Sequence, residues 1–349
     1  MRGIRRRTWL LSAVTAGAVL ALVVGGLFRG LGPWADDDSG ETLADTCRGA
    51  LAADEAGKFF GGAELEFSGH TAEWVGEDTE HCAASARDAG PNGADGSAGV
   101  RLELNIRPSA AYRASGAAES TSATPIGFGW NGSVVVSDQV QAGVLVDCAP
   151  LHGDGLLVLA ETRQDARELS DAQVLQVARF ATESARRAAK RFTCEGALGQ
   201  RPSAVDRTPV QTRPVARAKG TCRDVVGTRD AARLGLTRVS ERPAGRALTE
   251  MCSADLPADG HHFWLTAYYG PSAQQEMYLD QRYPGSVPGA VMRSHLCDGA
   301  LWTAYFKFEE FPRPDSAKGV RSTVADKDAE RLLAAFATAS GARHGCPVH

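Results

Sequence analysis

No two cysteines lie close together in this sequence, and that absence argues against a bound zinc ion. Structural zinc sites usually pair thiolates about two to four residues apart, whereas the nearest two of the eight cysteines, Cys194 and Cys222, are 28 positions apart. The sequence also lacks an H-E-x-x-H motif, a nucleophile elbow and a phosphate-binding loop. We therefore expect no metal, no cofactor and no catalytic residues, and we predict that the protein is not an enzyme.

Acidic residues are absent from the first 35 positions, where five arginines occur instead. Beyond Arg29 the chain therefore carries 33 basic against 42 acidic residues, a net charge of −9. A protein that binds nucleic acid needs a basic surface to neutralise phosphates. The acidic balance argues against nucleic acid as a partner.

Charge is also missing inside the run from Trp9 to Phe28, which is long enough to cross a bilayer. The arginines before it favour a cytoplasmic N-terminus and an extracellular remainder. We expect residues 1–29 to form the cytoplasmic arginines and a single-pass transmembrane anchor in the cell membrane, and residues 30–45 to form an acidic stalk. The alternatives are a cleaved signal peptide, disfavoured by the length of the run and a poor cleavage site, and a twin-arginine signal at Arg6-Arg7.

All eight cysteines lie in the predicted ectodomain, which indicates an oxidising compartment and four disulfides. Four cysteines in each half allow three pairings per half. We favour the pairing in which each disulfide ties a helix to the neighbouring sheet: Cys47–Cys82, Cys148–Cys194, Cys222–Cys252 and Cys297–Cys346.

The ectodomain contains an internal repeat, because Thr46-Cys47-Arg48 recurs as Thr221-Cys222-Arg223. We predict a first repeat at 46–194, a Pro-rich, semi-extended linker at 195–220 and a second repeat at 221–349. The middle cysteine interval is longer in the first repeat. The excess falls in a stretch from Pro108 to Pro125 rich in Ser, Ala and Thr, which we expect to be a surface loop.

Each repeat is predicted to be α+β, a small antiparallel sheet packed by an N-terminal and a C-terminal helix. The short first helices end at Gly61 and Gly235. Strict alternation from Val100 to Arg107 predicts a half-buried strand, and the apolar runs around Asp154-Gly155 and Asp298-Gly299 predict hairpins.

The closing helices carry the clearest local signals. Ser170 and Gln173 form a capping box at the start of the first one. Its expected buried stripe is Val174, Val177, Ala178, Ala181, Ala185 and Ala188. The second closing helix is expected to bury Leu332, Leu333 and Phe336.

Three other patterns have ordinary structural explanations. The segment from Gly127 to Gly132 fits G-x-G-x-x-G, but the strand-like Val134–Val136 follows it instead of a helix, so we expect a turn. His261 and His262 would point to opposite faces of a strand, which argues against a shared metal ion. Other histidines lie beside cysteines that we assign to disulfides, so no Cys/His nucleophile is expected.

The Cys-x3-[Leu/Val] openings at Cys47 and Cys222, a glycine about 13 to 14 residues later, a second cysteine and a helix ending at a cysteine resemble small actinobacterial cell-envelope lipoproteins and secreted proteins of unknown function. The chain departs from the lipoproteins because it lacks a lipidated cysteine and carries two copies. The resemblance implies a non-enzymatic binding or sensing role in the cell envelope. The alternative is an envelope hydrolase whose acid and base residues are scattered in the sequence.

Aromatic residues are scarce overall but gather in the predicted strand from Phe263 to Tyr269. Trp264 and Tyr268 share the face that is polar in the matching strand of the first repeat, and Tyr305 of the adjoining hairpin joins them. We predict that Trp264, Tyr268 and Tyr305 form a ligand-binding platform for a cell-wall glycan or an envelope protein. The alternative is that a helix or the first repeat covers this face.

Overall fold

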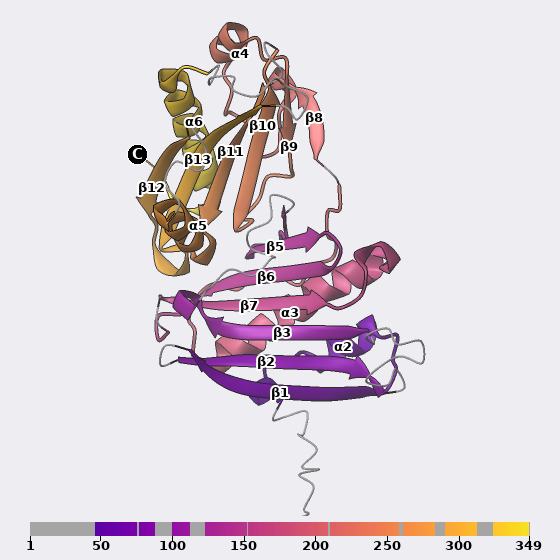
Figure 1. The fold of residues 1–349 in the computed structure, drawn as a ribbon. Helices are drawn as coiled ribbons and strands as arrows, with labels where there is room; N and C mark the ends of the chain where they lie inside the picture. Colours follow the sequence, from indigo (N-terminus) through magenta and orange to yellow (C-terminus); the bar gives the residue numbers. More distant parts are fainter. Residues whose placement is uncertain are drawn as a thin grey trace, which may run out of the picture. The chain divides into compact units, whose positions relative to one another are not determined.

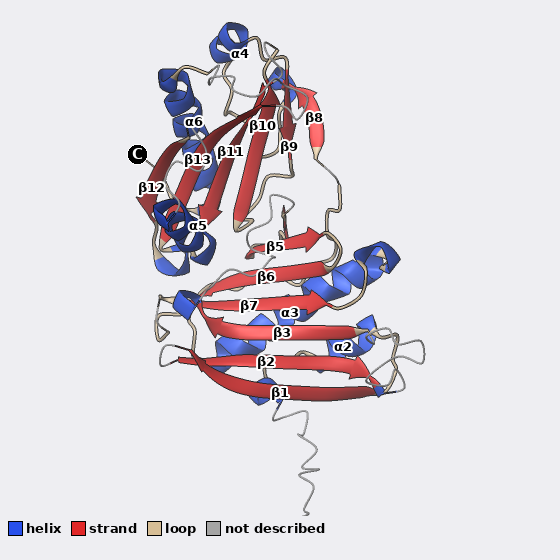
Figure 2. Ribbon diagram, in the orientation of Figure 1, coloured by secondary structure: helices blue, strands red, loops and turns tan. Residues whose placement is uncertain are grey.

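The computed structural model describes residues 46–74, 77–87, 100–111, 123–151, 153–208, 210–257, 261–282, 290–312 and 324–348. These residues form two antiparallel sheets with helices packed on them (Figures 1 and 2), which confirms the α+β class. The predicted anchor and stalk lie outside the described residues. Within the described ranges no helix has the length and apolar character needed to cross a membrane.

The first sheet has seven strands in the order β1-β2-β3-β7-β6-β5-β4. They are β1 (Leu65–Trp74), β2 (Glu77–Ala86), β3 (Arg101–Pro108), β4 (Thr124–Pro125), β5 (Asn131–Val136), β6 (Val140–Asp147) and β7 (Gly155–Thr162). Helix α3 (Asp171–Arg191) packs on β6 and β7, and the short α2 (Ala53–Phe59) packs on α3.

The second sheet has six strands in the order β12-β13-β11-β10-β9-β8. They are β8 (Gln211–Pro214), β9 (Arg238–Glu241), β10 (Thr249–Asp255), β11 (His261–Tyr269), β12 (Val291–Leu296) and β13 (Thr303–Pro312). Its helices are α4 (Thr228–Leu234), α5 (Pro271–Arg282) and α6 (Asp326–His344). Helices α5 and α6 both contact β11 and β13.

The two sheets share a five-strand order, β1-β2-β3-β7-β6 in the first half and β9-β10-β11-β13-β12 in the second. This correspondence supports the internal repeat. The first sheet continues beyond β6 with β5 and β4, whereas the second continues at its other end with β8. Strand β8 lies within the segment 195–220 that the sequence indicates as a linker, so part of that segment belongs to the second sheet.

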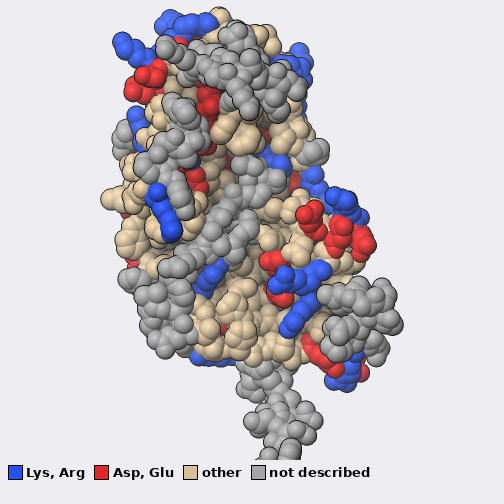
Figure 3. All heavy atoms as spheres, in the orientation of Figure 1, with Lys and Arg blue, Asp and Glu red and all other residues tan. Residues whose placement is uncertain are grey.

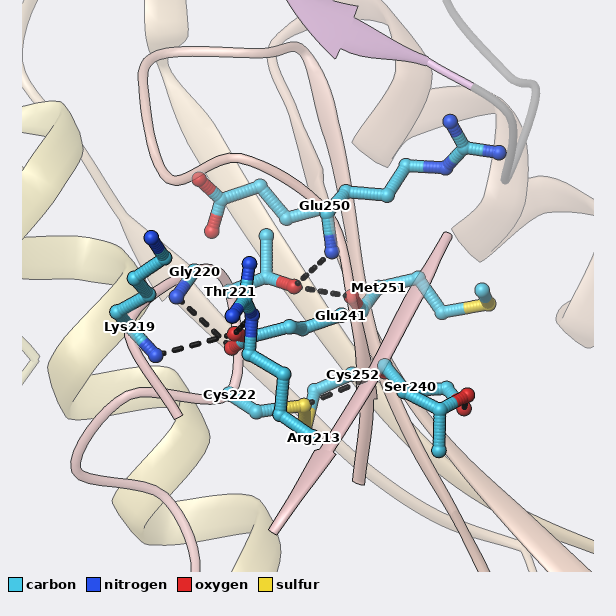
Figure 4. Close-up of a disulfide and its surroundings, with 12 residues drawn as sticks. Arg213, Lys219, Gly220, Thr221, Cys222, Ser240, Glu241, Glu250, Met251 and Cys252 are labelled. Carbon is cyan, nitrogen blue, oxygen red and sulfur yellow. Dashed lines mark hydrogen bonds and ion pairs between the residues drawn. A yellow bond between two sulfur atoms is a disulfide. The ribbon is translucent and has the colours of Figure 1, made fainter. Parts of the chain in front are cut away.

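The four predicted disulfides are all present, and every cysteine is paired as expected: Cys47–Cys82, Cys148–Cys194, Cys222–Cys252 and Cys297–Cys346. Figure 4 shows the third disulfide with the polar contacts beside it. The buried carboxylate of Glu241 accepts hydrogen bonds from the main-chain N–H groups of Lys219 and Gly220, at 3.1 and 2.8 Å. The chain entering Cys222 is therefore fixed to β9 as well as to β10.

The local signals of the first closing helix are confirmed. Ser170 is the N-cap of α3, its hydroxyl accepting from the Gln173 N–H at 3.3 Å while the Gln173 side chain accepts from the Ser170 N–H at 3.1 Å. The predicted apolar stripe of α3 is buried, as are Leu332, Leu333 and Phe336 of α6. Both hairpins are present as antiparallel pairs, although their connections are longer than two-residue turns.

The stretch predicted as a surface loop is ordered and packed at both ends. The Ser109 hydroxyl is buried and donates to the Gly153 carbonyl oxygen at 2.8 Å. Ala123 lies in the core, and Thr124 and Pro125 form β4, which pairs with β5. The expectation of a loop is therefore wrong at these ends, and residues 112–122 lie outside the described residues.

Strands β5, β6 and β7 are buried on both faces, which accounts for their uninterrupted apolar runs. Val134, Val144 and Val158 belong to the core that includes α3. Their neighbours Val135, Leu145 and Leu157 belong to a second core that also contains residues of β10, β11 and α6. The two halves thus share a hydrophobic core within one compact unit, residues 43–349.

Candidate binding site

The candidate site is the face of the second sheet that lies away from α6. Along β11, Phe263, Leu265 and Tyr269 point into the core, as the alternation predicts. The antiparallel register places Tyr268 opposite Tyr305 and Trp264 opposite Glu309. Trp264, Tyr268 and Tyr305 therefore share one face of the sheet.

Helix α5 covers two of these three residues. Tyr268 and Tyr305 are only 8% and 7% exposed and form a small apolar cluster with Ala273 and Met277 of the helix. Burial, and then the nearby carboxylates, raise the pKa of the Tyr268 phenol far above its usual value. The sequence left two possibilities for this face, an open platform or a covering helix. For Tyr268 and Tyr305 the structure shows the covering helix.

Ion pairs also hold helix α5 over the sheet. Its only buried residues are Pro271, Ser272 and Ala273 at its start. Farther along, the buried Lys307 of β13 places its Nζ 2.7 Å from Glu276 Oε1 and 3.2 Å from Asp280 Oδ1. Glu276 and Asp280 are one turn apart on the helix, so a single lysine can contact both carboxylates.

Two further contacts complete this buried polar cluster. The Tyr305 hydroxyl donates to Asp280 Oδ2 at 2.9 Å, and Glu309 Oε1 lies 3.2 Å from Lys307 Nζ. Burial alone would lower the pKa of Lys307, but the hydrogen bond to Glu276 and the surrounding carboxylates raise it above its usual value. Burial raises the pKa of Glu309, and Lys307 opposes that shift only in part.

Trp264 does not belong to the apolar cluster of Tyr268 and Tyr305 and is partly exposed. Its ring centroid is 5.0 Å from that of Phe311 and 5.7 Å from that of His262, and His262 and Phe311 are 5.6 Å apart. These three rings form an aromatic cluster on β11 and β13. The structure thus separates Trp264 from the two tyrosines with which the sequence grouped it.

The corresponding face of the first sheet is polar and contains a cavity of about 300 Å³. His70 and His81 lie directly opposite each other on β1 and β2, with their rings stacked 5.0 Å apart. Burial, and then the neighbouring His70 and Arg107, lower the pKa of His81. Glu103, which also lines the cavity, is paired with Arg163 at 2.8 Å. Ser68, which also lines the cavity, accepts a hydrogen bond from Arg101 at 3.0 Å.

A larger groove of about 790 Å³ runs along α6, and nothing in the sequence indicated it. Its floor is formed by small residues of the helix, and Arg223, Arg331 and Arg343 lie at its sides. In the first half, α2 and the chain after α3 cover the matching helix, where Arg186 and Arg179 donate to the carbonyl oxygens of Gly199 and Pro202. Helix α4 buries none of its residues and pairs with the start of α6 through Arg233–Asp328 and Asp230–Arg331, at 2.7 and 2.9 Å.

The ranges given above contain no group of three His, Cys, Asp or Glu side chains placed to hold a metal ion. On the face drawn in Figure 3, the described Lys and Arg side chains are interspersed with Asp and Glu.

Comparison with known proteins adds no relative. The chain matches no protein-family model, and searches of the curated proteins and of the solved structures gave no match.

Proposed function

We propose that the protein is a non-enzymatic binding or sensing protein of the cell envelope. In this proposal residues 1–29 anchor it in the cell membrane and the remainder lies outside the cell. The four disulfides support an oxidising compartment. The apolar run behind the N-terminal arginines supports the anchor. The resemblance to actinobacterial envelope proteins supports the binding role.

The partly exposed Trp264 is the observation that carries the proposed binding site. An aromatic ring on an open sheet face offers a flat apolar surface on which a sugar ring can stack. Phe311 and His262 widen that surface, and Glu309 lies directly across the strand pair from Trp264. A glycan of the cell wall fits this combination of stacking rings and a neighbouring carboxylate, and an envelope protein is the other partner considered.

The test is to substitute each member of the original platform separately. Tyr268→Ala should cost about 3 kcal/mol of unfolding free energy, because it leaves a cavity under α5. Trp264→Ala should cost about 1 kcal/mol, the scale of one aromatic pair, and should abolish retention of the full-length protein on isolated cell-wall material. The matched control is Trp302→Ala, since Trp302 is another tryptophan of the second half and is exposed.

The result that supports the proposal is loss of retention with Trp264→Ala and full retention with Trp302→Ala. A folded Trp264→Ala protein that is retained as well as the unsubstituted protein would overturn the assignment of this site.

A further inference from the structure

Strand β12 forms an edge of the second sheet, and among the described strands it pairs only with β13. It exposes two large apolar side chains, Met292 at 45% and Leu296 at 74%. Leu296 has the highest exposure of the large apolar residues in the described ranges. An edge strand with exposed apolar side chains is a ready template for pairing with another strand.

The first half shows that this strand position accepts a second neighbour. Strand β6 occupies the position in the first sheet that β12 has in the second: β6 lies next to β7, and β12 lies next to β13. It pairs with β7 on one side and with β5 on the other, from Asn131 opposite Leu145 to Val136 opposite Val140. The described part of the second half supplies no counterpart of β5.

We propose that β12 pairs antiparallel with β12 of a second copy of this chain, about a twofold axis at Ser294. Two antiparallel strands related by such an axis within one sheet must place one residue opposite its own copy. With Ser294 on the axis, Met292 faces Leu296 of the second copy, and Leu296 faces Met292. Each exposed apolar side chain of the edge then covers the other.

The charges of β12 select this register over its neighbours. An axis at Arg293 would set two arginines directly opposite each other, and like charges in that position destabilise a strand pair. An axis at His295 would leave Met292 outside the pair. At Ser294, each arginine faces a histidine and the two small serines meet at the centre. Residues 292–296 of β12 are therefore self-complementary about Ser294.

The face that such a pair would extend is the one that carries α5. Met292, Ser294 and Leu296 lie opposite Lys307, Tyr305 and Thr303 of β13, so they share the outer face of the sheet. Helix α5 also exposes Tyr278 and Leu279. These two side chains add apolar surface on that same face, where a second copy would be able to cover it.

The proposal is tested by disulfide crosslinking of the full-length protein in membranes. Residues directly opposite in an antiparallel pair have Cβ atoms about 4.5–5.5 Å apart, close to the reach of a disulfide. Ser294→Cys should give a covalent dimer on a non-reducing gel after mild oxidation. The matched control is Ser68→Cys, an exposed serine on β1, the edge strand of the other sheet.

Register is tested by co-expressing two differently tagged chains, one with Met292→Cys and one with Leu296→Cys. Crosslinks should form between the two chains about tenfold more than between identical chains. Leu296→Lys introduced beside Ser294→Cys should reduce crosslinking about tenfold without lowering the melting temperature, because Leu296 is exposed in the single copy. No dimer with Ser294→Cys, equal crosslinking with Ser68→Cys, or predominant crosslinks between identical chains would each overturn the proposal.

Discussion

Glu55 is a nearly fully buried carboxylate in α2, and its main partner comes from a position 146 residues later. The guanidinium of Arg201 contacts both carboxylate oxygens, at 2.5 and 2.9 Å, and Lys58 Nζ lies 3.0 Å away. Burial alone would raise the pKa of Glu55, but Arg201 and Lys58 lower it below its usual value. Arg201 belongs to the predicted linker, so this ion pair fixes the start of that segment to the first half.

We expect Arg201→Ala to lower the unfolding free energy by about 2 kcal/mol at pH 7, because it leaves a buried carboxylate with Lys58 alone. A carboxylate whose pKa is lowered by folding stabilises the protein above its unfolded pKa and loses that effect as the pH falls through the folded pKa. The difference between the variant and the unsubstituted protein should therefore shrink toward zero below about pH 4. Urea unfolding at pH 7 and at pH 3 measures both values.

Arg207→Ala is the control for this experiment, because Arg207 pairs with the exposed Asp171 and should contribute about 0.5 kcal/mol or less. Equal losses for the two variants at pH 7 would contradict the role given to Arg201.

One buried hydrogen-bond network could not be predicted from the sequence. Glu250 accepts hydrogen bonds from Ser340 and Arg343, and Ser340 in turn contacts the Tyr269 hydroxyl at 2.6 Å. These side chains come from β10, β11 and α6, and their sequence separations are 71 to 93 residues. No local pattern joins them, because their proximity depends on how the helix packs on the sheet.

At the scale of the elements, predictions held where a local rule decides the outcome. The capping box correctly predicted the start of α3, and the strict alternation correctly predicted strand β3. The β1–β2 hairpin escaped notice because much of β1 is solvent-exposed and carries no apolar period. Helix α5 was missed for a related reason, since Glu276 and Asp280 look like an ordinary solvated helix face until Lys307 is placed beneath them. The burial of Tyr268 and Tyr305 followed from that helix.

The segment between β3 and β5 gives a prediction at this scale. Replacing residues 112–122 with a Gly/Ser sequence of equal length should shift the melting temperature by less than about 2 °C, since this stretch has no apolar period in the sequence. Replacing 109–124 should lower it by about 4 to 8 °C, or roughly 2 kcal/mol. The longer replacement removes the buried Ser109 hydroxyl, Ala123 and Thr124, one of the two residues of β4.

Differential scanning calorimetry of the two replacements, with loop length held constant, separates packing from closure entropy. If the longer replacement melted at the same temperature as the shorter one, the packing of Ser109 and Ala123 would contribute nothing measurable.

At the scale of the whole molecule, the repeat was visible in the spacing of the cysteines, but the joining of the halves was not. Each disulfide closes within one half, and the halves meet through apolar residues of β5, β6 and β7. The apolar runs around Asp154-Gly155 predicted a hairpin. They gave no indication that residues of the second half pack on these strands, because a run of valines and leucines does not specify its partner.

The disulfides lead to a prediction about the whole protein and its compartment. They close segments of 30 to 49 residues, and a loop of this size contributes roughly 3 to 4 kcal/mol by restricting the unfolded chain. Domains are typically stable by only about 5–15 kcal/mol, so the loss of all four should unfold the protein. Reduction and alkylation should abolish the near-ultraviolet circular dichroism of the full-length protein.

The same cysteines can be used to test on which side of the membrane the protein lies. Non-reducing peptide mapping of protein taken from membranes should find the four pairs and no link between residues below 195 and above 221. In intact, wall-stripped cells, brief reduction should make the cysteines reactive toward a maleimide that cannot cross the membrane, because the proposed orientation places all eight outside. Labelling that appears only after lysis would place these cysteines inside the cell and contradict the proposed topology. Free thiols on a fully folded protein would contradict the stabilising role of the disulfides.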